Sequence, residues 1–288
     1  MAFDYPLAQF IPFRDADACA RVRAIRRADL CTHSNPEFRI AVIDDPVEFY
    51  SRFAIDIVTR IADAGKAGRK CVLILPVGPV PQYAVAAEMI NRLGISCRHL
   101  VTYNMDEYAD ASGETAPADW EGSFATAMRG SFFLRIREEL RPPEENIHFP
   151  THRNIADYHK MIEDDGGADC CYGGIGWCGH IAFWESHLGL EFGDDLAAYK
   201  QAPGRIVELN PMTIMAPQFT TSSAIESQAA NPWATTAPTT AVNMDTPASG
   251  MRCGRRWRKA SRARAAPATR AASMNGRPLM LGAWERNT

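Results

Sequence analysis

The chain has 288 residues and a formal net charge of −3, and 46% of its residues are hydrophobic. This length suits one sizeable α/β domain or two small ones. The near-balanced charge gives no global reason to expect a nucleic acid or an anionic membrane as a partner, and no stretch is apolar and long enough to span a bilayer.

Residues 1–37 carry some helical pattern but no clear element, and we interpret them as an N-terminal extension. They lack the basic-then-apolar order of a secretory signal. The eight cysteines are scattered, which is poor material for a disulfide framework in a chain of this size. These features predict a cytoplasmic protein.

The regular part of the chain begins at Phe38. The run 38–43 (FRIAVI) predicts a short strand, and a helix should open at Pro46. Asp45 suits the cap of that helix, because its side chain can accept a hydrogen bond from the first turn. Apolar residues follow at helical spacing until Gly68 ends the helix.

Next comes a continuous apolar run at 71–75, which predicts a strand buried on both faces. The loop 76–81 leads into a helix that Gly94 should end, and 98–104 predicts a further strand. The remaining pattern predicts helices at 123–136 and 155–162 and a buried strand at 168–172.

Strands that alternate with helices predict an α/β fold, a mostly parallel, Rossmann-like sheet with helices on both faces. Ligands bind beyond the carboxyl ends of the strands in such sheets. Three loops should lie there: 76–81, 104–110 and 173–185. We therefore expect the functional residues in these loops.

The third loop reads GGIGWCGHIAFWE from Gly173 to Glu185. Its GIGWCG fits a dinucleotide-binding pattern, but that pattern belongs after the first strand of a nucleotide-binding domain, so a nicotinamide site is disfavoured. His180 can face a ligand and exchange protons near neutral pH, and Glu185 can orient its ring. The alternative is a histidine that bonds only to nearby backbone.

A metal site is the other possibility that this loop raises. Soft ligands are available at Cys170, Cys171, Cys178 and His180. Adjacent residues on a strand point to opposite faces, however, so Cys170 and Cys171 cannot converge on one ion. This geometry disfavours a metal.

The second loop begins with Asn104, Met105, Asp106 and Glu107. Two adjacent carboxylates at the end of a buried strand can supply a base in a cleft. An acidic loop that merely caps the next helix is the alternative, and this segment alone leaves both open.

Together the two segments resemble motifs of the glucosamine-6-phosphate deaminase/isomerase family. VTYNMDEY at 101–108 is similar to the family motif that ends in N-M-D-E-Y, and 173–185 is similar to G-G-x-G-x-D-G-H-I-A-F-N-E. The resemblance covers about 38–219. The related 6-phosphogluconolactonases share the Gly-His turn.

The resemblance implies an enzyme that converts an aminosugar 6-phosphate to a ketose 6-phosphate and ammonia. His180, oriented by Glu185, would open the sugar ring, and Asp106 would carry the C2 proton to C1. Glu107 would be structural. No cofactor is implied, since carboxylate and imidazole suffice for these proton transfers. The substrate would also contact three glycines: Gly78, Gly174 and Gly176.

Several positions depart from the family pattern. Cys178 stands where the family has an Asp that assists ring opening. Trp177 and Trp184 replace small polar residues. In the phosphate loop, Pro79 and Pro81 lack the backbone N–H groups that would bind phosphate. A non-catalytic sugar-phosphate-binding relative and a 6-phosphogluconolactonase-type hydrolase therefore stay as alternatives.

The region 220–288 forms the third part of the expected organisation, after the extension and a domain at 38–219. It is rich in Ala, Thr, Pro and Arg, with no sustained apolar period. Such a basic tail is what an out-of-frame reading of GC-rich DNA produces, and a nucleic-acid-binding arm is the alternative. We favour the first interpretation. The expected partners are a small sugar phosphate and further copies of the chain.

Overall fold

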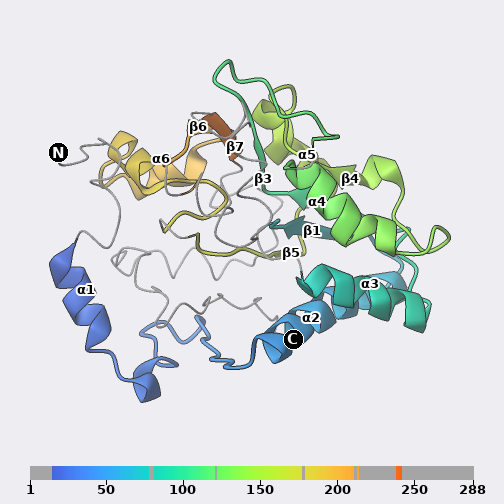
Figure 1. Cartoon of the computed structure of the whole chain (residues 1–288), viewed down its shortest axis with the longest axis horizontal. Helices are drawn as coiled ribbons and strands as arrows, with labels where there is room; N and C mark the ends of the chain where they lie inside the picture. The colour runs from blue at the N-terminus through green and yellow to red at the C-terminus, as the bar shows by residue number, and fades with distance from the viewer. Residues whose placement is uncertain are drawn as a thin grey trace.

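The computed structural model describes residues 15–77, 81–120, 122–176, 179–210, 213 and 238–241. Its centre is a four-stranded parallel sheet in the order β4-β2-β1-β5 (Figure 1). The strands are β1 (Cys71–Leu75), β2 (Leu100–Asn104), β4 (Ile147–His148) and β5 (Cys170–Cys171). All residues of β1 and β2 are buried, which confirms the burial predicted for β1 from its continuous apolar run.

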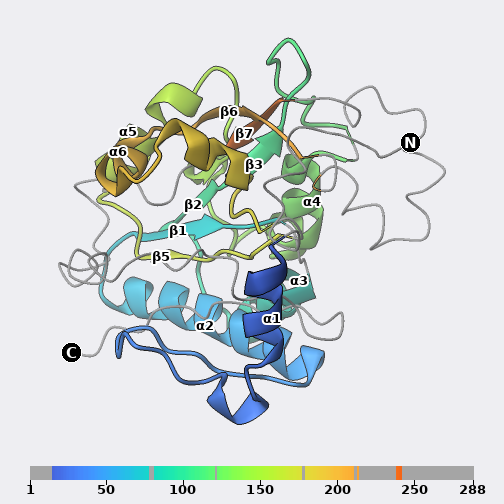
Figure 2. The ribbon, with the colours of Figure 1, turned by 90° about the vertical axis from the view of Figure 1, so that its left-hand side faces the viewer.

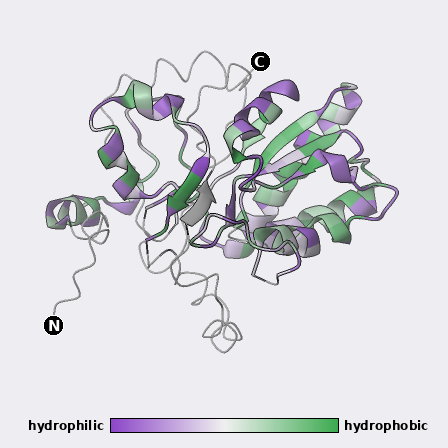
Figure 3. Cartoon of the chain, turned by 90° about the horizontal axis from the view of Figure 1, so that it is seen from above, coloured by the Kyte–Doolittle hydropathy of each residue, from purple (hydrophilic) through white to green (hydrophobic). Residues whose placement is uncertain are grey.

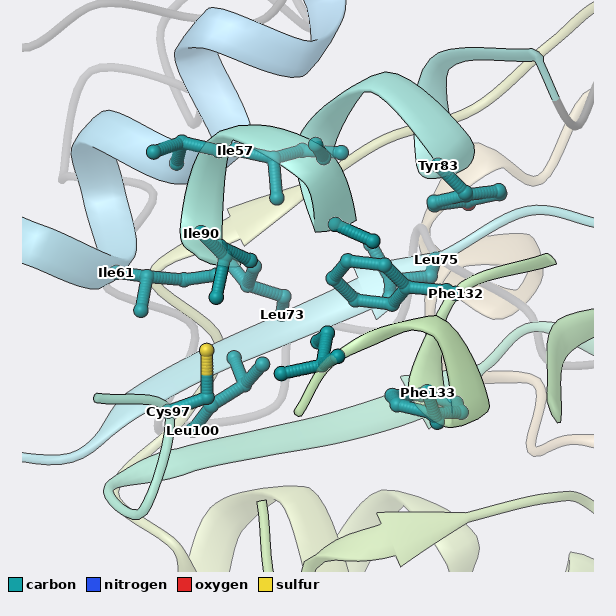
Figure 4. Close-up of a cluster of buried hydrophobic side chains, with 14 of the residues drawn as sticks. Ile57, Ile61, Leu73, Leu75, Tyr83, Ile90, Cys97, Leu100, Phe132 and Phe133 are labelled. Atoms are coloured by element: carbon teal, nitrogen blue, oxygen red, sulfur yellow. The ribbon is translucent and has the colours of Figure 1, made fainter. Parts of the chain in front are cut away.

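One face of this sheet is covered by α2 (Pro46–Lys66), α3 (Pro81–Leu93) and α4 (Phe124–Ser131). The side chain of Asp45 accepts a hydrogen bond from Val47 N, which confirms the predicted cap of α2. Figure 4 shows apolar side chains of α2, α3, β1 and β2 meeting in one core with Phe132 and Phe133, which follow α4. Burial of this core is the main source of stability on this face.

The opposite face packs against α5 (Tyr158–Asp164), through Val72, Ile74 and Tyr103 of the strands. Figure 2 shows α2 and α5 on opposite sides of the sheet. Colouring by hydropathy shows the apolar residues concentrated in the parallel strands and the polar residues on outer helix surfaces (Figure 3). The predicted α/β fold, with helices on both faces of a parallel sheet, is confirmed.

A second, antiparallel sheet lies next to the parallel one, in the order β3-β7-β6. It comprises β3 (Asp106–Tyr108), β6 (Arg205–Glu208) and β7 (Pro238–Ala241), and α6 (Leu196–Gln201) precedes β6. The sequence did not predict this sheet. β7 comes from within the expected tail, and the rest of that tail lies outside the described residues, so the proposed boundaries at 37 and 219 stay predictions.

The N-terminal region contains α1 (Ala16–Arg23), and one expectation for the following segment is wrong. Residues 38–43 form no strand, and none of them is buried. An isolated apolar run needs a neighbouring strand to complete its hydrogen bonds, and no described strand pairs with it.

None of the described helices is long and apolar enough to cross a membrane.

Candidate active site

The carboxyl ends of β1, β2 and β5 lie at the same edge of the sheet, because these strands are parallel and Leu75 pairs with Asn104. The segments carrying Asp106 and His180 leave from this edge. Aromatic contacts join them: the ring of Phe183 lies 5.6 Å from that of Tyr108 and 5.6 Å from that of Phe124, between centroids. The fold thus brings the two motifs to one end of the molecule.

Asp106 is a buried carboxyl group with an unused hydrogen-bonding atom. The residue is 8% exposed, and its Oδ1 has no hydrogen-bond partner among the described residues. Burial, helped by the neighbouring charge of Glu107, raises the pKa of Asp106 to about 8. A carboxyl group that titrates near neutrality in a buried site is suited to proton transfer.

Glu107 has a different environment from its neighbour. Its carboxylate accepts hydrogen bonds from the backbone N–H groups of Tyr108 (3.0 Å), Phe124 (2.9 Å) and Ala125 (2.9 Å). Two of these donors belong to the first turn of α4, where a negative charge also interacts favourably with the helix dipole. Burial raises the pKa of Glu107, and these three bonds oppose the effect. Glu107 holds β3 against α4, which agrees with a structural role.

The Gly-rich turn fits closely around the His180 ring. Gly176 N donates to His180 O (2.8 Å), and Gly179 N donates to Gly176 O (2.9 Å) with Gly179 at φ +85°. A Cβ atom at position 176 would lie 2.1 Å from His180 Nε2, so any other residue there would require the ring to move. A Cβ atom at Gly174 would meet nothing within 4 Å. Gly78, Trp177 and Cys178 lie outside the described residues.

Two residues after His180 adopt an uncommon backbone conformation. Ala182 and Phe183 have φ angles of 51° and 56°, in the left-handed region that non-glycine residues rarely enter. Such conformations cost about 1–2 kcal/mol each. The tight turn is closed by Trp184 N, which donates to Ile181 O (2.8 Å). This turn returns the chain so that Glu185 faces the ring of His180.

The ring of His180 contacts two groups through Nδ1. Thr213 Oγ1 lies 3.1 Å from this nitrogen, and Glu185 Oε2 lies 3.8 Å from it. Burial lowers the pKa of His180 to about 4, so the ring is neutral at physiological pH. Burial also raises the pKa of Glu185 to about 7. Thr213 and the backbone N–H of Asn210, which donates to Oε1, lower this pKa and so oppose part of the effect of burial.

Sequence reasoning did not single out Thr213, although it makes the hydrogen bond to the ring. It lies 33 residues beyond His180 and follows β6, so only the folded chain brings the two together. The site therefore contains a buried carboxyl group, a neutral imidazole and a second buried carboxyl group. Because their surroundings shift their pKa values in different directions, one of these groups can act as a general acid while another acts as a general base.

Known proteins resemble this chain over part of its length. A glucosamine-6-phosphate deaminase of Caenorhabditis elegans is 35% identical over 181 residues, which are 60% of this chain and 60% of the relative. A glucosamine-6-phosphate isomerase of Candida albicans is 33% identical over 156 residues, 51% of this chain and 58% of the relative. The chain thus spans three-fifths or less of the length of these curated relatives. No family model matches it.

Among solved structures, a monomeric glucosamine-6-phosphate deaminase, described as a missing link of the NagB superfamily, has a TM-score of 0.52 and 21% identity. The match covers 69% of this chain and 73% of that one. This likeness supports the α/β fold. The resemblance predicted from the two motifs is confirmed: over its matched residues, the chain is homologous to curated glucosamine-6-phosphate deaminases.

Proposed function

We propose that this chain converts an aminosugar 6-phosphate, such as glucosamine 6-phosphate, to the ketose 6-phosphate and ammonia. The observation that carries the proposal is the placement of buried Asp106, with its unused Oδ1, and partly buried His180 at one edge of the sheet. Both lie in segments that resemble the curated deaminases, and the names of those relatives supply the substrate class.

The chemistry begins with opening of the sugar ring. His180 is neutral, and its Nε2 makes no hydrogen bond to a described residue, so this nitrogen can exchange a proton with the sugar hydroxyl and ring oxygen. Opening gives the free aldehyde. No metal is needed for this step, since the proton that leaves the C1 hydroxyl is the one that the ring oxygen gains.

Asp106 then moves a proton between carbon atoms. In its ionised form the carboxylate takes the proton from C2, which produces an enolamine, and returns it to C1. The resulting imine at C2 reacts with water, and ammonia leaves. A buried carboxylate is a stronger base than an exposed one, which is why the raised pKa of Asp106 favours this role.

Two alternatives use less of the site. A lactonase-type hydrolase would need His180 as a base but not Asp106. A relative that binds sugar phosphate without turnover would use neither, and Cys178 in the place of the family Asp favours this alternative.

Ammonia release from glucosamine 6-phosphate labelled with deuterium at C2, with the deuterium recovered at C1 of the product, tests the proposal. We expect Asp106→Asn to abolish both signals and the matched variant Asp110→Asn to preserve them, because Asp110 serves a local turn. Ammonia release that persists in Asp106→Asn would remove Asp106 from the reaction. Acid release from 6-phosphogluconolactone without ammonia release would establish the hydrolase instead.

The cytoplasmic location and the self-association expected from the sequence also belong to this proposal. Sedimentation of the purified chain at several concentrations tests the second. A single monomeric species at all concentrations would contradict it.

A further inference from the structure

The group that touches the inner nitrogen of the His180 ring is a hydroxyl. Thr213 Oγ1 is 3.1 Å from Nδ1, whereas Glu185 Oε2 is 3.8 Å from the same atom. Hydrogen bonds to nitrogen are formed at about 2.7–3.2 Å. The contact at 3.1 Å is therefore a hydrogen bond, and the carboxylate acts on the ring only from a distance.

Thr213 and Glu185 are both buried, at 2% and 1% exposure, and the segment after β6 holds them together. Thr213 N donates to Asn210 O (2.8 Å), and Asn210 N donates to Glu185 Oε1 (3.1 Å). The Thr213 hydroxyl is close enough to the Glu185 carboxyl group to lower its pKa. Glu185 Oε2 is buried and has no hydrogen-bond partner among the described residues.

A hydroxyl group has one proton to donate and lone pairs to accept with. If Thr213 donated to Nδ1, the buried Glu185 Oε2 would be left without a described donor, which is costly for a carboxylate. If Thr213 donates toward Glu185, its oxygen is free to accept from Nδ1–H. In this second arrangement the His180 Nδ1–H, the Thr213 hydroxyl and the Glu185 carboxylate each have a hydrogen-bond partner.

We propose that Thr213 is a positioning residue that links His180 to Glu185: Nδ1–H donates to Thr213 Oγ1, and the Thr213 hydroxyl donates toward the Glu185 carboxylate. The link selects the tautomer of His180 that carries its proton on Nδ1. Nε2 then carries the lone pair of the ring, on the ring edge that lies next to Gly176. Its catalytic consequence rests on the proposed function, but the tautomer itself does not.

The first test reads the tautomer directly by nitrogen-15 NMR of labelled protein, with the His180 signals assigned from a His180→Gln variant. We expect His180 to show a protonated Nδ1 and an unprotonated Nε2. Thr213→Val, which replaces the hydroxyl with a methyl group, should give mixed tautomers, and Thr213→Ser should restore the original signals. The matched control is Thr102→Val, because Thr102 is equally buried and its hydroxyl has no described partner.

The second test is kinetic. Thr213→Val should lower kcat roughly tenfold, the equivalent of about 1.4 kcal/mol, with little change in KM. Thr213→Ser should recover most of the activity, and Thr102→Val should match the parent chain. If the valine variant does not fold, as judged by circular dichroism, Thr213→Ala replaces it.

An unchanged tautomer in Thr213→Val would overturn the inference, and so would equal losses in Thr213→Val and Thr213→Ser. Failure of the proposed function is recognised separately. The parent chain could release no ammonia while the His180 tautomer still responds to substitution of Thr213 as expected. That result would support the positioning role of Thr213 and contradict the proposed deaminase activity.

Discussion

Gly176 and the ring of His180 are packed so closely that a single methyl group would separate them: a Cβ atom at position 176 would fall 2.1 Å from Nε2. This contact places the reactive nitrogen of the histidine against bare backbone. The second glycine of the G-x-G pattern, Gly176, is therefore explained by the close approach of the His180 ring and does not require a bound nucleotide.

Gly176→Ala should therefore displace the His180 ring and lower ammonia release by roughly two orders of magnitude, since small misplacements of catalytic groups carry such losses. Gly130→Ala is the matched control, because Gly130 lies in α4, outside the two motifs, and a Cβ atom there would meet nothing within 4 Å. Steady-state kinetics of both variants tests this. Equal activities would show that the ring tolerates the methyl group.

Asp106→Asn should stabilise the protein while it abolishes activity. In the folded chain burial raises the pKa of Asp106 to about 8, from the 3.8 that is usual for an aspartate. Between these values the folded state binds the extra proton, so stability falls as pH rises from about 4 to about 8. The asparagine variant has no such titration.

Thermal unfolding of both proteins at pH 5 and pH 8 measures this effect. The gain from Asp106→Asn should be larger at pH 8, by at least about 1 kcal/mol, because one pKa unit corresponds to about 1.4 kcal/mol. The same gain at both pH values would mean that Asp106 titrates normally in the folded chain.

The pH profile of kcat/KM should rise toward alkaline pH, with an apparent pKa near 8 for the free enzyme. The reason is that Asp106 must lose its proton before it can act as a base. His180 is already neutral above about pH 4, so a reaction that used it alone would be flat from pH 5 to 8. A rise centred near 7 that disappears in Glu185→Gln would assign the titration to Glu185.

Cys178→Asp should raise ring-opening activity about tenfold or more. A carboxylate at this position would stabilise the charged form of His180, and hydrogen bonds to charged groups contribute ~1.5–3 kcal/mol. Initial rates of ammonia release compare the two chains, and Cys171→Asp serves as a control from the preceding strand. Lower activity in Cys178→Asp would indicate a pocket adapted to the thiol.

Much of the fold was accessible from the sequence because its signals are local. Asp45 caps α2 through a hydrogen bond to a residue two positions away, so the sequence around it is enough to predict the cap. β1 and β2 are short buried strands, and such strands show as local patterns of residues in the sequence. The exception is 38–43, where an apolar run lacks a strand to pair with. The sheet formed by β3, β7 and β6 was not predicted, because its pairs join distant parts of the chain.

For the site, the two motifs determined which residues to examine: Asp106, His180 and Glu185. Only the tertiary structure decided what surrounds them. Burial from several elements raises the pKa of Asp106, and the hydroxyl that holds the His180 ring comes from Thr213, far along the chain. Desolvation and long-range hydrogen bonds depend on groups distant in sequence, so no local pattern encodes them.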